Sequence, residues 1–91
     1  MNYEWDETKR ADNLAKHAVD FALVEDFAWD GAFIVPDKRR EYGEPRFIAI
    51  GYLGEWLYVL VFTPRLEATR VIGLRKANRR EVKLYAAQIR V

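Results

Sequence analysis

Three consecutive apolar runs constrain the fold of this chain more than any other feature. They cover residues 46–53, 56–63 and 69–75, and each is rich in β-branched and aromatic side chains and bounded by turn residues. Gly54-Glu55 separates the first two runs and suits a two-residue hairpin turn of type II′, which takes glycine first. Residues 64–68 form a second connection of ordinary length for antiparallel neighbours. The sequence therefore predicts a three-stranded antiparallel meander.

The predicted strands are apolar on both faces. In the first strand, Ile48 and Ile50 alternate with Phe47 and Ala49. An antiparallel sheet with one face in water would instead alternate apolar with polar residues. Helices or a partner must therefore cover much of both faces.

Arginines mark the ends of these strands. Arg46 begins the first strand, Arg65 follows the second, and Arg70 and Arg75 lie near the two ends of the third. We expect Arg46 and Arg75 to share one end of the sheet, and Arg65 and Arg70 to share the other.

Two short helices are predicted before the meander. Asp6 is a suitable N-cap for a first helix that runs to His17. Helical spacing assigns its apolar stripe to Ala11, Leu14, Ala15 and Ala18, and its polar face to Lys9, Arg10, Asp12, Asn13 and Lys16. Asp20 is expected to cap a second helix with the apolar stripe Phe21, Val24 and Phe27.

The rest of the chain supplies strands, a charged loop and a closing helix. Residues 32–36 are predicted to form a short strand that ends at Pro36, and residues 3–5 could add an edge strand. Residues 37–45 are predicted to form a charged loop. Asn78 and Glu81 have the spacing of a capping box. The final helix is expected to bury Val82, Tyr85, Ala86 and Ile89 and to expose Arg79, Arg80, Lys83 and Arg90. We therefore expect one α+β domain over residues 1–91, with two N-terminal helices, an antiparallel sheet of about four strands and a C-terminal helix.

Composition excludes several classes of site. The 91 residues contain no cysteine and one histidine, which excludes disulfides and thiolate zinc sites and argues against a histidine-rich metal site. There is no phosphate-binding glycine loop. The N-terminus does not look like a signal peptide, and no apolar run reaches the length of a membrane span. We expect a cytoplasmic protein.

Charge is distributed unevenly although the formal net charge is only +1. Residues 1–30 carry three basic and eight acidic side chains, residues 31–64 carry four of each, and residues 65–91 carry eight basic and two acidic. A basic third of a chain indicates an anionic partner such as nucleic acid. The alternative is a charge dipole that only keeps the protein soluble.

The charged loop is the densest candidate site. It holds Lys38, Arg39, Arg40, Tyr42, Glu44 and Arg46. Phosphoryl chemistry needs cations that stabilise charge on the phosphate oxygens, and the planar guanidinium binds phosphate through two hydrogen bonds. In this interpretation Glu44 acts as a base, and Tyr42 stacks on a nucleobase or donates a proton. The alternative is a solvated loop in which Glu44 pairs with Arg46.

Further candidate residues lie around the start of the last helix and at the end of the first helix. Arg75, Lys76, Arg79 and Arg80 surround a helix N-terminus, which itself favours an anion. His17 has a side chain suited to acid–base catalysis, although a histidine also interacts favourably with the carbonyls at a helix end. Tyr85 lies on the apolar stripe, so a core role competes with a catalytic one. Arg65 and Arg70 suit the RNA backbone or a partner equally well.

As an ordered set, these segments resemble the BrnT family of type II toxin–antitoxin systems over nearly the whole chain. The matching pieces include Trp5-Asp6-Glu7-Thr8-Lys9, Asn13-Leu14-Ala15-Lys16-His17, Tyr42-Gly43-Glu44-Pro45-Arg46, Thr63-Pro64-Arg65, Arg70-Val71-Ile72 and Arg75-Lys76-Ala77. There are two departures. Relatives often have glycine where this chain has Ala18, and serine where it has Gly73.

The resemblance implies a RelE-like fold and an endoribonuclease that arrests translation without a metal or organic cofactor. In its reaction the 2′-hydroxyl of RNA attacks the adjacent phosphate. It also implies a BrnA-type antitoxin with a ribbon-helix-helix domain. This antitoxin silences the toxin, and the toxin reaches operator DNA only through the antitoxin. Carried over to this sequence, it assigns transition-state charge to Arg46 and Arg75 and the general base to Glu44. Substrate binding falls to Arg39, Tyr42, Arg65, Lys76 and Arg79, with His17 and Tyr85 as further candidates. The alternative is a non-catalytic module of the same fold that binds the antitoxin and acts in co-repression.

Overall fold

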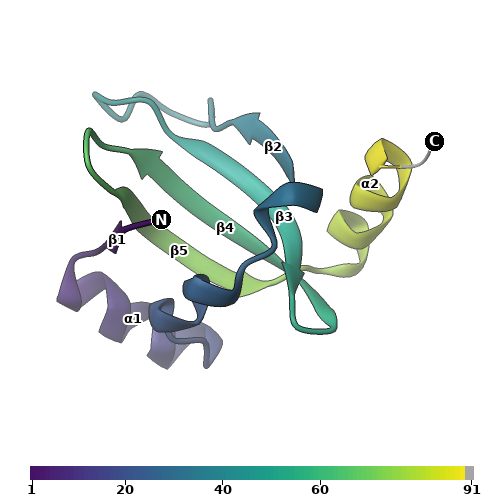
Figure 1. Ribbon diagram of the computed structural model, residues 1–91, viewed down its shortest axis with the longest axis horizontal. Helices are drawn as coiled ribbons and strands as arrows, with labels where there is room; N and C mark the ends of the chain where they lie inside the picture. Colours follow the sequence, from purple (N-terminus) through teal and green to yellow (C-terminus); the bar gives the residue numbers. More distant parts are fainter. Residues whose placement is uncertain (90–91) are drawn as a thin grey trace.

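The predicted meander forms the centre of a five-stranded sheet in the computed structural model, which describes residues 1–89 (Figure 1). The strands are β1 (Tyr3–Glu4), β2 (Phe33–Pro36), β3 (Phe47–Leu53), β4 (Trp56–Pro64) and β5 (Thr69–Lys76), in the order β1-β5-β4-β3-β2. β1 is parallel to β5 and the other pairs are antiparallel. The α+β class is confirmed. The sheet is mixed and has five strands rather than about four, because residues 3 and 4 form the additional edge strand. Arg90 lies outside the described residues.

The turn between β3 and β4 has the predicted geometry. Gly54 has a φ of 68°, and Ala18 is the only residue other than glycine with a positive φ in the described chain. The second turn residue, Glu55, therefore has a negative φ, which distinguishes a type II′ turn from type I′.

The predicted second helix is two short 3₁₀ helices rather than an α-helix. They are η1 (Phe21–Asp26) and η2 (Trp29–Gly31), and Asp20 caps η1 by accepting the Ala22 N–H at 2.9 Å. Phe21, Val24 and Phe27 repeat every three residues, which matches the three-residue turn of a 3₁₀ helix. All three side chains are buried in the main core against one face of the sheet.

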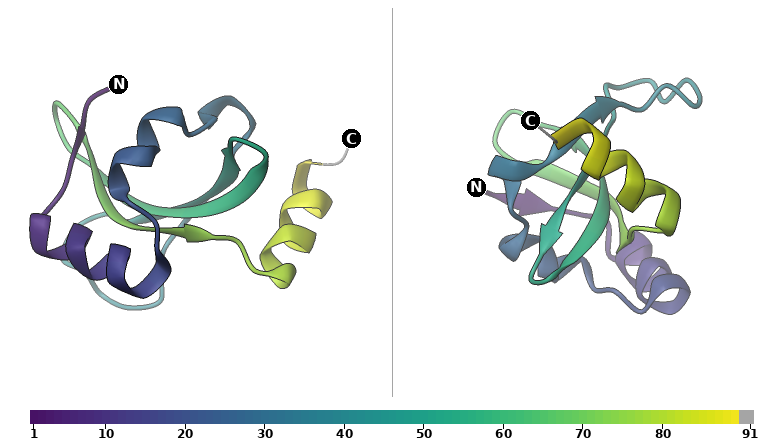
Figure 2. Two further views of the ribbon diagram at one scale, coloured as in Figure 1. Left: turned by 90° about the horizontal axis from the view of Figure 1, so that it is seen from below. Right: turned by 90° about the vertical axis from the view of Figure 1, so that its right-hand side faces the viewer.

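The two helices α1 (Glu7–His17) and α2 (Arg79–Ile89) lie at opposite sides of the molecule (Figure 1). α1 packs along β5, and α2 packs against β2 and β3. Figure 2 shows η1 and η2 over one face of the curved sheet, with α2 standing away from them. A smaller core of Ile50, Leu57, Val59 and Tyr85 joins α2 to the other face.

The burial of α1 is the reverse of the predicted pattern. Asn13 is the buried residue of this helix, whereas Leu14 is 46% exposed. The Asn13 amide donates to the carbonyls of Leu74 (2.7 Å) and Val19 (2.9 Å), and its oxygen accepts the Leu74 N–H at 3.2 Å. β1 pairs only with Thr69 and Arg70, so β5 has an open edge at Leu74, and a side-chain amide satisfies it.

α2 begins as predicted but buries less than predicted. Asn78 and Glu81 form a reciprocal capping box, with both hydrogen bonds at 2.9 Å. Of the expected apolar stripe only Tyr85 is buried, while Val82 and Ile89 are 43% and 41% exposed. The expectation of a covered helix was therefore wrong for most of this stripe.

The predicted placement was wrong for Arg46 and Arg75, whereas Arg65 and Arg70 share one end of the sheet as expected. Phe47 pairs with Phe62, and Arg75 pairs with Val59, so Arg46 lies at the end of the sheet where β4 finishes and Arg75 lies toward the other end. Arg65 joins the Arg46 end through Glu44. The cause is the alternation of an antiparallel meander, in which the start of the first strand lies beside the end of the second.

Candidate functional site

Arg46 and Arg75 belong to the same face of the sheet although they lie toward opposite ends of their strands. Arg75 is opposite Val59, which is opposite Ile50, and directly paired residues project to the same side. Residues of one strand alternate between faces, so position 46 shares the face of Ile50. η1 and η2 cover the other face, which leaves this one open between α1 and α2.

A groove on the open face collects basic side chains from separate parts of the chain. Its floor is Val61 of β4 and Gly73 of β5. Its walls carry Lys9, Lys16 and His17 from α1, and Arg39 and Arg46 from the 37–46 loop. Asp12 is the one acidic residue in the lining. The arrangement suits a polyanion better than a neutral ligand.

Asp37 organises the loop that supplies the two arginines. Its side chain is fully buried, accepts hydrogen bonds from Arg39 Nε (2.8 Å) and Nη2 (2.7 Å), and accepts the Tyr42 hydroxyl at 3.1 Å. The Asp37 N–H also donates to the Arg46 carbonyl at 2.7 Å. The Arg39 hydrogen bonds hold the pKa of Asp37 well below its ordinary value, so this buried carboxylate stays charged.

Arg46 keeps hydrogen-bonding capacity unused. Its guanidinium lies over the Tyr42 ring, with Cζ 3.8 Å from the centroid, and its Nη2 is 3.9 Å from Glu44 Oε2. Its Nε is buried and has no hydrogen-bond partner in the described part of the chain. A buried N–H donor without a partner is costly. Because this nitrogen is shielded from the groove, an anion accepts from it only if the Arg46 side chain shifts.

Arg75 is occupied by an internal partner. Its Nη1 and Nη2 donate to the two carboxylate oxygens of Glu81 at 2.8 and 2.7 Å. This pair raises the pKa of Arg75 and lowers the pKa of Glu81. The positive charge of Arg39 acts in the opposite direction on the pKa of Arg75, since the two guanidinium groups face the same region.

The structure brings together only some of the predicted site residues. Arg39, Arg46 and His17 meet in the groove, and Glu44 and Tyr42 lie on the other side of Arg46 in a second pocket. Glu44 accepts from Arg65 at 3.0 Å. The remaining residues lie elsewhere, with Lys76 over the Trp56 ring (4.6 Å), Arg79 exposed on α2, and the Tyr85 hydroxyl donating to the Gly31 carbonyl (2.7 Å).

Sequence reasoning missed Asp37 and Asn13 as organising residues, and Lys9 and Lys16 as walls of the groove. For Asp37 a signal was present, because an aspartate two residues before an arginine at the start of a loop is typical of a local side-chain turn. The lysines carried no comparable signal. Within residues 1–89 no cluster of histidine and acidic side chains suits a metal ion, and no helix is long and apolar enough to cross a membrane.

The chain matches a known protein family over most of its length. The family described as "Ribonuclease toxin, BrnT, of type II toxin-antitoxin system" matches residues 5–81. No curated protein matches the chain. The matched stretch contains α1, the 37–46 loop and β5, and therefore every residue that lines the groove.

Proposed function

Because the chain belongs to the BrnT family of type II toxin–antitoxin ribonuclease toxins, we propose that it cleaves RNA in the basic groove on the open sheet face. Translation arrest follows from that cleavage in a cell. An antitoxin of the ribbon-helix-helix class neutralises the toxin and brings it to operator DNA. The observation that carries the proposal is the groove itself, whose walls bring together the side chains of Arg46, Arg39, Lys9 and Lys16.

The reaction is an internal transesterification. The 2′-oxygen attacks the adjacent phosphorus and the bond to the 5′-oxygen breaks, which leaves a 2′,3′-cyclic phosphate and a 5′-hydroxyl. A base accepts the 2′-hydroxyl proton, and an acid returns a proton to the leaving oxygen. Negative charge builds on the non-bridging oxygens in the transition state, and fixed guanidinium groups stabilise it without a metal ion.

Arg46 is the first candidate for that stabilisation. Tyr42 fixes one face of its guanidinium, and Asp37 fixes Tyr42. A cation held in place before the substrate arrives pays little reorganisation energy when charge develops. Arg39, Lys9 and Lys16 then hold neighbouring phosphates of the strand, because they line the same groove.

Arg75 acts only after it exchanges Glu81 for a phosphate oxygen. Both of its terminal nitrogens are occupied by Glu81 in the free protein. The doubly charged phosphorane-like transition state is a stronger acceptor than a carboxylate, so the exchange is favoured when charge develops. We expect Glu81→Gln to weaken the internal pair and to raise kcat with little change in KM, because Arg75 engages the phosphate only as charge develops.

Glu44 and His17 are the two candidate bases. Glu44 approaches Arg46 but already accepts from Arg65, whereas His17 lines the groove directly. Separate Glu44→Gln and His17→Gln variants distinguish them. The variant that lacks the base loses kcat and the limb of the pH–rate profile that the base contributes.

The first experiment induces the chain alone and measures protein synthesis and the ends of cleaved RNA. Arg46→Ala should abolish arrest and cleavage while keeping the fold. Arg70→Ala is the matched control, because Arg70 pairs with Glu4 and does not line the groove. Translation arrest by the parent protein and by both variants would show that the groove is not the cleavage site. Normal growth with the parent protein would leave the non-catalytic interaction module.

A further inference from the structure

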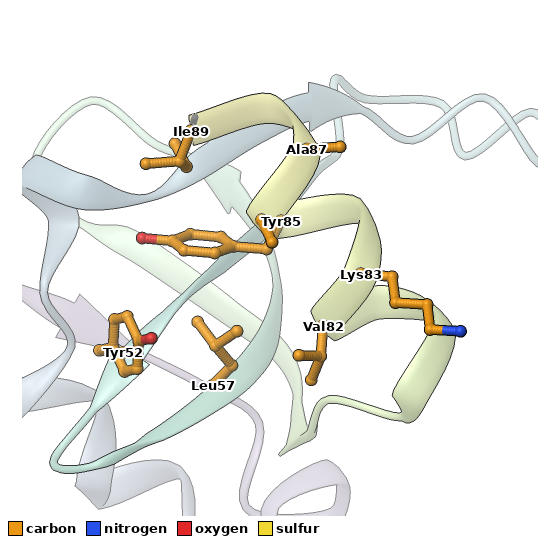
Figure 3. Close-up of a pocket in the computed structure, with 8 residues that line it drawn as sticks. Tyr52, Leu57, Val82, Lys83, Tyr85, Ala87 and Ile89 are labelled. Carbon is orange, nitrogen blue, oxygen red and sulfur yellow. The ribbon is translucent and has the colours of Figure 1, made fainter. Parts of the chain in front are cut away.

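The α2 helix forms one wall of an apolar groove that nothing in the described chain fills. Val82, Tyr85 and Ile89 project from α2 to the side where Tyr52 and Leu57 form the opposite wall, and the Lys83 side chain extends outward from the edge of the groove (Figure 3). Val82, Ile89 and Tyr52 are between 41% and 44% exposed. An amphipathic helix normally buries such a stripe against another element, so the exposed stripe has the form of half an interface.

Three sets of hydrogen bonds fix the position of α2, so its apolar stripe remains exposed at the groove. The Asn78–Glu81 capping box fixes its first turn, Glu81 ties it to Arg75, and the Tyr85 hydroxyl ties its middle to Gly31. An 11-residue helix is marginal in water without such support. A groove wall fixed before binding lowers the conformational entropy that a partner must offset.

The charges around the groove indicate the chemistry of the partner. Lys83 lines the groove and also lines a neighbouring pocket together with Arg79 and Arg80. The only carboxylate of this helix within residues 79–89, Glu81, is paired with Arg75. The opposite wall contributes one exposed acidic residue, Glu55, in its turn. An apolar floor bordered on the α2 side by basic residues is complementary to a segment that presents apolar residues flanked by acidic ones.

We propose that this groove, defined by Tyr52, Leu57, Val82, Tyr85 and Ile89, binds an acidic amphipathic helix of the neutralising antitoxin. The inference rests on the proposed function, since it identifies the antitoxin as the occupant. α2 spans about 16 Å at 1.5 Å per residue, which accommodates about three turns of a partner helix.

Two other occupants fit the observations less well. A second copy of this chain would bring the same excess of basic side chains against itself, which disfavours a symmetric pair. RNA would satisfy the basic rim, but its backbone has no favourable contact with a floor of Leu57, Val82 and Ile89.

The test uses the purified toxin and the purified antitoxin encoded beside it, with affinity measured by calorimetry. The double variant Val82→Ser with Ile89→Ser should weaken binding at least tenfold. Lys83→Glu should weaken it about three- to tenfold and reduce its dependence on salt. The matched control is Leu14→Ser on α1, which has a similarly exposed leucine outside the groove and should bind within twofold of the parent protein.

Several outcomes would overturn the proposal. These are unchanged affinity in the double variant, tighter binding by Lys83→Glu, or a parent dimer that the double variant abolishes. Loss of RNA affinity instead of antitoxin affinity would assign the surface to RNA. If the double variant does not fold, Lys83→Glu still tests the proposal, because it changes an exposed side chain and should fold normally. A parent protein that binds the antitoxin through this groove but cleaves no RNA would refute the catalytic proposal alone.

Discussion

Replacing Asp37 tests whether one buried carboxylate holds the loop that presents Arg39 and Arg46. Its side chain is fully buried and accepts three side-chain hydrogen bonds and a fourth from the Arg39 N–H at 3.2 Å. Breaking a buried ion pair typically costs 3–5 kcal/mol, but the Arg39 side chain is 65% exposed and regains water. We therefore expect Asp37→Ala to lower the free energy of unfolding by about 3 kcal/mol, and Asp37→Asn by roughly 1.5–2 kcal/mol.

Thermal unfolding followed by circular dichroism measures this loss. For a domain of this size, 1 kcal/mol corresponds to about 4–8 °C, so Asp37→Ala should melt roughly 12–24 °C below the parent protein. Tyr42→Phe is the graded control. It keeps the ring beneath Arg46 and loses only the hydroxyl bond to Asp37, so it should cost about 1 kcal/mol.

The pH dependence gives a second and independent check. The pKa of Asp37 is lowered in the folded protein, so its stabilising contribution is complete above the ordinary aspartate pKa of about 3.9 and is lost as the pH falls toward the folded value. The difference in stability between the parent and Asp37→Asn should be constant from pH 5 to 7 and should narrow below about pH 4. A difference below about 0.5 kcal/mol at pH 7, or one that does not narrow in acid, would refute this role for Asp37.

Three further predictions concern single positions, each checked by melting experiments. Ala18→Gly should stabilise the protein by about 0.5–1 kcal/mol, because Ala18 ends α1 at a φ of 58° and glycine adopts this conformation without strain; a loss of stability would contradict it. Gly51→Ala should cost about 1–3 kcal/mol, since a Cβ there would lie 2.7 Å from Phe27 Cζ, whereas the control Gly73→Ala, with 3.9 Å to its nearest neighbour, should be nearly neutral. Arg10 lowers the pKa of Asp20 to about 2, so acid should destabilise the parent between about pH 4 and 2 and Asp20→Asn less; equal acid sensitivity would argue against the pair.

The elements that followed from the sequence are those set by local chemistry. Gly54-Glu55 specified the hairpin turn, and Asn78 with Glu81 specified the start of α2, because each is satisfied by atoms within a few residues. The meander followed from its apolar runs and turns. In these cases the physical cause and the sequence signal lie in the same short segment.

The errors arose where a distant backbone decided the outcome. Asn13 is on the polar side of its helix by pattern, yet it is buried, because the open edge of β5 at Leu74 requires hydrogen bonds that leucine or alanine cannot supply. The exposure of Val82 has a related cause, since nothing in its own sequence states whether a second element covers it. Helical periodicity identifies a stripe but does not identify what the stripe faces.

The candidate site was predictable as a set of residue types and only partly as an arrangement. Arg46 and Arg39 were predicted from a loop dense in charge, and both reach the groove. The unsatisfied Nε of Arg46, the buried position of Asp37 and the pairing of Arg75 with Glu81 depend on distances that spacing alone does not contain.

The Glu81 carboxylate binds both Arg75 and the first turn of α2, and this has a thermodynamic consequence. Its Oε1 accepts from Arg75 and from the Asn78 N–H, so the same carboxylate that holds the arginine also begins α2. Anything that draws Arg75 toward a phosphate weakens the anchoring of that helix, and anything that stabilises the helix raises the free energy of releasing Arg75. By reciprocity, a ligand on α2 and an anion at Arg75 oppose each other without touching. We therefore expect Glu81 to couple the start of α2 to the availability of Arg75.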